Sequence, residues 1–272
     1  MICFPNAKIN LGLNIVLKRK DGYHNLETVF YPINIQDALE IIPAKDGKDS
    51  FVEAGIKIDS LPENNLVMKA LQLVRKYYQI PALEIHLLKK IPFGAGIGGG
   101  SADASFMLKL LNSTFELSIT NKELADLAVK LGADCPFFVY NRPMFARGVG
   151  EILEEVSLSL SAYYLVLVKP DIHIPTCDAF AQVKPETPET SLKEIIKLPV
   201  EEWKNVMVND FEKSIFSKYP AIENIKQKLY SLGAIYSSMS GSGSSVYAIF
   251  KGETDIKSLF PDCYVWEGKA TI

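Results

Sequence analysis

The stretch Pro92-Phe93-Gly94-Ala95-Gly96-Ile97-Gly98-Gly99-Gly100-Ser101-Ala102-Asp103 places five glycines between a strand-like segment and a helix-like one. Glycine lets backbone N–H groups converge on an anion without obstruction by a Cβ atom. A helix predicted to open at Ser101 would add its unsatisfied N–H groups and the positive end of its dipole. The stretch therefore predicts a polyphosphate-binding loop.

Glycine- and serine-rich segments also serve as flexible linkers, so the flanks of this stretch matter. Residues 83–88 are strand-like, and residues 104–111 carry apolar side chains at helical spacing. Ordered elements on both sides favour a functional loop over a linker. A Walker A loop is excluded, because Gly100 stands where that pattern requires lysine.

The dinucleotide-binding fingerprint is the second interpretation of the same loop. Gly94, Gly96 and Gly99 satisfy G-x-G-x-x-G, and Glu116 lies near the place of a ribose-binding acid. Against it, Lys89 and Lys90 interrupt the preceding strand, and repeated βαβ units are absent downstream. A nicotinamide-dependent dehydrogenase remains the less favoured alternative.

The composition is that of an ordinary globular protein of 272 residues, 48% hydrophobic and 22% charged, with room for two lobes. The formal net charge of −3 argues against a general attraction to nucleic acid or to an anionic membrane. The four cysteines lack C-x-x-C spacing and the three histidines are dispersed, so no zinc site is predicted. No targeting or membrane-spanning segment is recognised, and we expect a cytoplasmic protein.

Strands and helices interleave along the chain without an obvious repeat, which predicts an α+β fold. Residues 7–17 alternate, so that Lys8 and Asn10 share the polar face of a strand. Further strands are expected at 27–33, 38–42, 51–58, 137–140, 163–168, 246–250 and 264–266. Helices are expected at 65–79 and 255–259. One more helix is expected to begin at the capping box at 120–123 and end at a left-handed cap at Gly132, and further helices are expected from the capping box at 191–194 to residue 232. Residues 144–156 are expected to cross between an N-terminal domain, 1–155, and a C-terminal domain, 156–272.

Phosphoryl transfer requires positioned phosphates, neutralised charge and a group that takes the proton of the attacking hydroxyl. Lys8 is a candidate for charge stabilisation, Asp134 for the base and Ser101 for a Mg²⁺ contact. Each has a plainer explanation: a solvated strand lysine, a turn former and a helix N-cap. Spacing does not indicate whether Lys8 and Asp134 meet in space.

Two further segments carry residue types suited to a ligand. The turn at Asp21-Gly22-Tyr23-His24 offers a stacking face and polar groups for a flat heteroaromatic ligand, or serves packing alone. The run Ser240-Gly241-Ser242-Gly243-Ser244-Ser245 could bind a second phosphate or form a tight turn.

Together these segments resemble the GHMP kinases over most of the chain. The resemblance rests on the glycine loop, on 5–11, 21–24, 132–138, 148–151, 174–176, 209–212 and 240–243, and on their order. It implies a ribosomal-protein-S5-like N-terminal domain and a ferredoxin-like C-terminal domain. The D-G-Y-H and I-P-T segments point to the members that phosphorylate the 2-hydroxyl of a cytidine diphosphate-bearing alcohol in the non-mevalonate isoprenoid pathway.

The resemblance also implies a role for particular residues, with ATP and Mg²⁺ as cofactors. Lys8 and Asp134 match the catalytic pair, and Asn10 a substrate contact beside them. Tyr23 and Phe180 match an aromatic pair that sandwiches cytosine, His24 the residue that bonds its edge, and Thr176 a position beside that pocket. The match for ATP comprises Asn65 and Lys89, near the adenine, and the loop Pro92, Phe93, Gly94, Ala95, Gly96, Ile97, Gly98, Gly99, Gly100, Ser101 and Ala102.

The loop departs from the family pattern at three positions, Phe93, Ala95 and Ala102, where Met, Gly and Ser are common. The missing hydroxyl at Ala102 puts one phosphate or Mg²⁺ contact in doubt. The predicted partner is a small molecule, in a monomer or homodimer. The alternatives are another GHMP-type kinase acting on a different alcohol, and a nucleotide-binding relative without catalysis.

Overall fold

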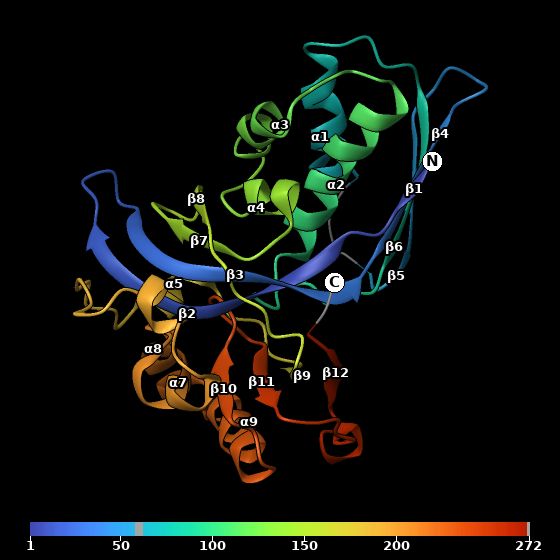
Figure 1. Ribbon diagram of the computed structural model, residues 1–272. Coiled ribbons are helices and arrows are strands. Elements are labelled where there is room, and N and C mark those ends of the chain that lie inside the picture. The colour runs from blue at the N-terminus through green and yellow to red at the C-terminus, as the bar shows by residue number, and fades with distance from the viewer. Residues whose placement is uncertain (58–61, 271–272) are drawn as a thin grey trace. The chain divides into compact units, whose positions relative to one another are not determined.

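Runs of strands and runs of helices follow one another along the chain in this computed structural model, which describes residues 1–57 and 62–270 (Figure 1). The contacts divide the chain into two compact units. The first comprises Met1–Ala7, Ile35–Phe93 and Gly98–Arg142, and the second comprises Lys8–Asn34, Gly94–Ile97 and Pro143–Ile272. Both units draw on separate segments of sequence. The continuous domains 1–155 and 156–272 stay a prediction.

The first unit is a mixed sheet with helices, and its strands lie in the order β1-β4-β6-β5. Only β5 and β6 are parallel in this sheet, and α1 lies between them in sequence, as in a βαβ crossover. The strands are β1 (Ile2–Cys3), β4 (Ala38–Pro43), β5 (Ser50–Gly55) and β6 (Leu83–Lys89). The helices are η1 (Pro62–Asn64), α1 (Leu66–Arg75), α2 (Gly99–Thr114), α3 (Asn121–Ala128) and α4 (Cys135–Tyr140).

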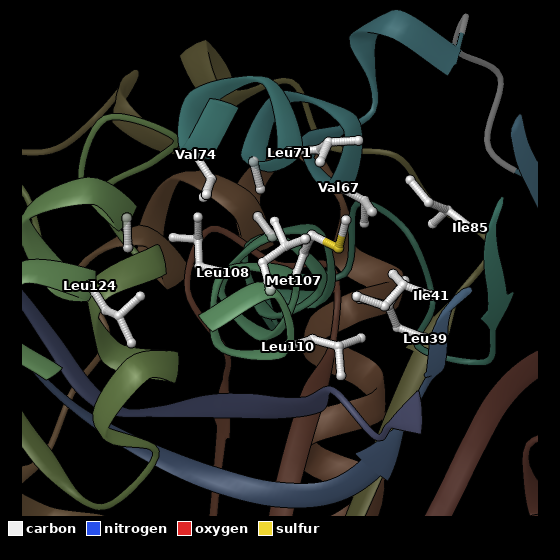
Figure 2. Packing of buried hydrophobic residues seen from close by; sticks show 14 of the residues in the cluster. Leu39, Ile41, Val67, Leu71, Val74, Ile85, Met107, Leu108, Leu110 and Leu124 are labelled. Atoms are coloured by element: carbon white, nitrogen blue, oxygen red, sulfur yellow. The ribbon is translucent and has the colours of Figure 1, made fainter. Parts of the chain in front are cut away.

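The core of the first unit forms where α1 and α2 pack together and against the sheet (Figure 2). The spacing of Val67, Leu71 and Val74 places them on one face of α1, which turns toward Met107 and Leu108 of α2. Full burial of each such side chain stabilises the fold by roughly 1.5–3 kcal/mol. This core fixes α2, the helix that follows the glycine loop.

The second unit contains two antiparallel sheets. One has the order β2-β3-β7-β8, and the other has the order β10-β11-β9-β12. The first is built from β2 (Asn6–Lys18), β3 (His24–Gln36), β7 (Met144–Arg147) and β8 (Ile152–Glu155), and the second from β9 (Tyr164–Pro170), β10 (Tyr236–Met239), β11 (Val246–Phe250) and β12 (Cys263–Lys269). Numbered within the C-terminal segment, the second sheet has the strand order 2-3-1-4, which is the ferredoxin-like arrangement.

Helices connect β9 to β10. They are α5 (Thr176–Phe180), α6 (Leu192–Ile195), α7 (Val200–Val206), α8 (Phe211–Lys218) and α9 (Pro220–Ser231), and the short η2 (Lys257–Leu259) precedes β12. Of the helices between β9 and β10, α5, α8 and α9 contribute to a core shared with the sheet that contains these strands. Val166 and Val168 of β9 belong to the same buried cluster as Ile222 and Leu229 of α9. None of the helices in the described residues is both long and apolar enough to cross a membrane.

The α+β class and most predicted elements are confirmed, including the capping box of Thr120 and Glu123. Several local predictions are wrong. Ser191 caps α6 by accepting the N–H of Lys193, but the predicted capping box with Glu194 does not form, because the Glu194 carboxylate pairs with Lys197. Residues 137–140 belong to α4, because Pro136 in the first turn starts a helix. Residues 144–156 form the β7–β8 hairpin instead of a crossing, and Gly132 lacks the predicted left-handed conformation. Residue 58 of the predicted strand 51–58 lies outside the described residues.

The dinucleotide-binding interpretation fails on topology. A doubly wound sheet requires successive parallel strands, whereas β6 is antiparallel to β4 and parallel only to β5. Glu116 follows the end of α2 in a left-handed turn, with φ of 50°, and no strand leads into it.

Burial of β2 differs from the expected two-faced pattern. Residues 6–15 are buried on both faces of the strand, so Lys8 and Asn10 are enclosed and not solvated. A charged lysine with 3% of its surface exposed is costly to bury unless polar groups surround it. The plain explanation of Lys8 as a surface residue is therefore wrong.

Candidate active site

The first half of the glycine loop, Gly94–Ile97, lies within the second unit and packs on the Ser240–Ser245 turn. Ser240 Oγ donates to Gly96 O at 2.9 Å, and Ser245 N donates to Ala95 O at 3.2 Å. A Cβ atom on Gly96 would stand 2.1 Å from Ser240 O, and the φ of Gly96 is 72°. Only glycine fits here, and the Ser240–Ser245 turn braces the loop.

The side chain of Asn209 is hydrogen-bonded to the backbone at the start of the Ser240–Ser245 turn. Its Nδ2 donates to Met239 O at 2.8 Å and to Gly241 O at 2.9 Å, and its side chain is buried. Its Oδ1 accepts the N–H of Phe211 at the start of α8. Asn209 lies in the N-D-F-E segment, but sequence pattern alone gave it no role.

Lys8 lies beside this braced part of the loop. Its Nζ donates to Asn10 Oδ1 at 2.6 Å and to Gly96 O at 3.5 Å, and it stands 4.8 Å from the centre of the Phe30 ring. Asn10 Nδ2 donates to Thr28 Oγ1 at 2.9 Å. This chain of hydrogen bonds fixes the ammonium group, so the structure brings together three predicted site residues, Lys8, Asn10 and Gly96.

The second half of the loop is the start of α2 and belongs to the first unit. Gly98, at the N-cap, has φ of 73°, and its carbonyl accepts the N–H of Ala102 at 2.9 Å. The helix begins at Gly99, two residues before the predicted start. Because the first N–H groups of a helix have no partners within it, residues 99–101 present donors suited to a phosphate.

Asp134 is the residue before α4, in the same unit as Ser101. The carbonyl of the neighbouring Cys135 accepts a hydrogen bond from Ser105 Oγ at 2.7 Å. The thiol of Cys135 is hydrogen-bonded to the side chain of Ser101. Burial raises the pKa of the Cys135 thiol to about 11, so this group stays protonated and is not a nucleophile at neutral pH. Lys8 and Asp134 fall in different units, and their joint action is a proposal treated below.

Two residues predicted near the adenine are engaged with protein groups. Asn65 caps α1 by accepting the N–H of Val67 at 2.9 Å, and it donates to Glu53 at 2.8 Å. Lys89 is buried with two carboxylates, Asp37 and Asp103. A direct contact of Lys89 with ATP stays a prediction, which this pairing disfavours. Pro92 is buried, whereas Phe93 is exposed at the head of the loop.

The residues predicted for cytosine lie in the second unit. The rings of His24 and Phe180 stack at 4.6 Å between centres, with 26° between their planes, and Phe180 meets Phe211 edge-on. Tyr23 is 65% exposed, so the aromatic facing Phe180 here is His24 and not Tyr23. Burial, and then the charge of Lys18, lower the pKa of His24, which favours a neutral imidazole. Thr176 begins α5, and its side chain lies outside the described part of the structure.

Comparison with known proteins agrees with this arrangement of loop, strands and helices. The family model for the GHMP kinases N terminal domain matches residues 65–142, and that for the GHMP kinases C terminal domain matches residues 185–260. The chain is a small-molecule kinase of the GHMP class, which uses ATP.

Individual proteins that are highly similar to this chain identify its family within the GHMP kinases. A 4-diphosphocytidyl-2-C-methyl-D-erythritol kinase of Parabacteroides distasonis is 60% identical over 99% of both chains, and one of Bacteroides fragilis is 59% identical over 95% of both. A crystal structure of 4-(cytidine 5'-diphospho)-2C-methyl-D-erythritol kinase matches with a TM-score of 0.85 and 30% identity over 98% of both chains. The chain belongs to the family of 4-diphosphocytidyl-2-C-methyl-D-erythritol kinases.

Proposed function

We propose that this chain transfers the γ-phosphoryl group of ATP to the 2-hydroxyl of 4-diphosphocytidyl-2-C-methyl-D-erythritol, giving the 2-phosphate and ADP in the non-mevalonate isoprenoid pathway. The names of its relatives support this substrate. The observation that carries the chemistry is the buried ammonium of Lys8, held by Asn10 beside Gly96 of the phosphate loop.

In this reaction Asp134 takes the proton of the 2-hydroxyl, and the oxygen then attacks the γ-phosphorus in line with the departing ADP. Lys8 stabilises the negative charge on the transferring group and has no freedom to swing away, because Asn10 fixes its Nζ. The N–H groups at the start of α2 bind phosphate oxygens. The residue roles follow from the GHMP resemblance together with these contacts.

A Mg²⁺ ion would accompany ATP, since the γ-phosphoryl group carries charge that a divalent cation neutralises. In the described residues no group of three His, Cys, Asp or Glu side chains could hold a metal by itself. Kinase Mg²⁺ sites take most of their ligands from phosphates and water, with one or two protein oxygens. Ser101 and Asp134 are oxygen donors of that kind, so the chain fits a Mg²⁺ ion brought in by the nucleotide.

The cytosine of the substrate would stack on Phe180, with Tyr23 as the second aromatic face and His24 at its edge. The His24 ring now occupies one face of Phe180, so cytosine would take the place of that ring. A neutral His24 imidazole can both donate and accept a hydrogen bond, which suits the amino group and ring nitrogen of cytosine. We also propose a cytoplasmic location, which four free thiols support.

The test is to incubate the protein with ATP, Mg²⁺ and the cytidine substrate and to follow ADP and the phosphorylated product by mass spectrometry. Asp134→Asn should abolish turnover and leave ATP binding intact. Asp126→Asn, an exposed acid on α3, is the matched control and should turn over normally. Full activity of the Asp134→Asn variant would refute the mechanism.

The choice of substrate has its own test. Phe180→Ala and Tyr23→Ala should raise KM for the cytidine substrate and leave KM for ATP unchanged, because in the proposed complex their rings would stack on the cytosine and not on ATP. ATP binding by the protein without product would favour a different alcohol substrate or a relative without catalysis.

A further inference from the structure

The described part of the first unit contains a buried cluster of three charged side chains that the reaction does not use. Lys89 Nζ forms an ion pair with Asp103 Oδ2 at 2.6 Å and a second with Asp37 Oδ2. At most 3% of each side chain is exposed. We refer to Asp37, Lys89 and Asp103 as the buried triad.

The members of the buried triad come from three segments that meet at the glycine loop. Lys89 is the last residue of β6, and Asp103 lies in the second turn of α2. Asp37 lies between β3 and β4 and also accepts the backbone N–H groups of Lys90 at 2.5 Å and Ile91 at 2.8 Å. The triad therefore joins the strand that enters the loop to the helix that leaves it.

The first turn of α2 packs directly on this cluster. A Cβ atom on Gly99 would lie 3.6 Å from Lys89 Nζ and 2.7 Å from Ile91 Cγ2. Lys89 and Ile91 therefore lie against the helix start that carries the N–H groups of Gly99 and its neighbours. Those N–H groups are the phosphate donors of the proposed function.

Stability alone is a weak reason for such a cluster. Buried ion clusters pay a large desolvation cost, and apolar side chains of similar size often stabilise a core equally well. Among the described residues, no hydrogen-bond partner is found for Asp103 Oδ1, which adds to that cost. A role in fixing the local geometry explains the presence of these buried charges better than a role in stability.

We propose that Asp103 and Lys89 are positioning residues, which hold the start of α2 against the end of β6 so that its N–H groups are preset for the phosphates of ATP. This rests on the proposed function, since it assigns the phosphates to that helix start. In this role neither side chain contacts the nucleotide itself. Their removal would loosen the helix start and weaken phosphate binding, while the adenosine part of ATP would keep its contacts.

The test compares the affinities of the purified full chain for ATP and for adenosine by calorimetry. Asp103→Leu keeps the branched shape of the side chain but removes both oxygens and so breaks the link to Lys89, and Asp103→Ala removes the side chain beyond Cβ. We expect both to raise the Kd for ATP at least tenfold and to leave the Kd for adenosine within threefold. Asp103→Asn keeps a hydrogen-bond acceptor for Lys89 and should restore ATP binding to within threefold of the natural protein.

Leu110→Ala is the matched control, because Leu110 is buried on the same helix, two turns further on, in the core that Figure 2 shows. It should lower thermal stability and leave the ratio of the two affinities unchanged. An ATP affinity of Asp103→Leu equal to that of the natural protein, or an equal loss in Leu110→Ala, would overturn the inference. Failure of the natural protein itself to bind ATP would instead reject the proposed function.

Discussion

Replacing Gly96 by alanine tests whether the phosphate loop depends on its close approach to the Ser240–Ser245 turn. The new Cβ atom would stand 2.1 Å from Ser240 O and 2.9 Å from Gly243 O, whereas ordinary contact begins at 3.4 Å. One backbone segment must therefore move by about 1.3 Å. Both segments are backbone, so no flexible side chain can absorb the movement.

The energetic cost has two parts. An alanine at φ of 72° costs about 1–2 kcal/mol as left-handed strain, and overpacking of a filled site adds typically 1–3 kcal/mol. The displaced loop carries Gly96 O away from Lys8, and misplacement of reacting groups by about 1 Å can lower turnover about 100-fold. We expect kcat/KM for ATP to fall by about that factor.

The Gly47→Ala variant separates the cost of left-handed strain from the cost of overpacking. Gly47 has φ of 71°, almost that of Gly96, but a Cβ atom there would meet nothing within 4 Å. This variant should lose only the strain energy, about 1–2 kcal/mol, and keep full activity. Thermal unfolding and steady-state kinetics of the two variants give the comparison. Equal stability and equal activity in both would refute the close-approach argument.

Three further variants probe the buried polar groups. Asn10→Ala removes the acceptor that fixes Lys8 and should lower kcat about ten- to 100-fold, as expected for a buried charged hydrogen bond of about 1.5–3 kcal/mol, with KM for ATP nearly unchanged in steady-state assays. Asn209→Ala takes the Asn209 donor from the carbonyls of Met239 and Gly241, of which Met239 O keeps a longer bond from Ser238 Oγ at 3.4 Å, and it should cost about 1–3 kcal/mol in denaturant unfolding; an unchanged midpoint would contradict this. Burial raises the pKa of Asp103 well above 3.8, so the folded state holds a proton on Asp103 over a pH range in which the unfolded state has lost it. The free energy of unfolding should therefore fall as pH rises from about 3.8 to the raised pKa. In the Asp103→Asn variant, which has no carboxyl at this position, this part of the pH dependence should be missing.

Local patterns in the sequence identified much of the fold and the composition of the site. Glycines at fixed offsets between a strand and a helix predicted the phosphate loop, and the alternating pattern of β2 put Lys8 and Asn10 on one face. The errors arose where local preference was ambiguous. Residues 137–140 are apolar and aromatic, which suits a strand, but Pro136 and the packing of the first unit favour a helix.

What the sequence by itself determined were the features encoded by near neighbours: the loop, the capping box at Thr120, the strand periodicity and the family. The tertiary structure decided which distant residues meet. The contact of Gly96 with Ser240 spans 144 positions, and Lys89 pairs with Asp37 across 52. Asp103 lies within the quoted loop sequence, yet nothing near it in sequence shows that it is buried against Lys89. Such pairings depend on how whole elements pack, because burial and charge pairing are properties of the assembled core and not of any short segment.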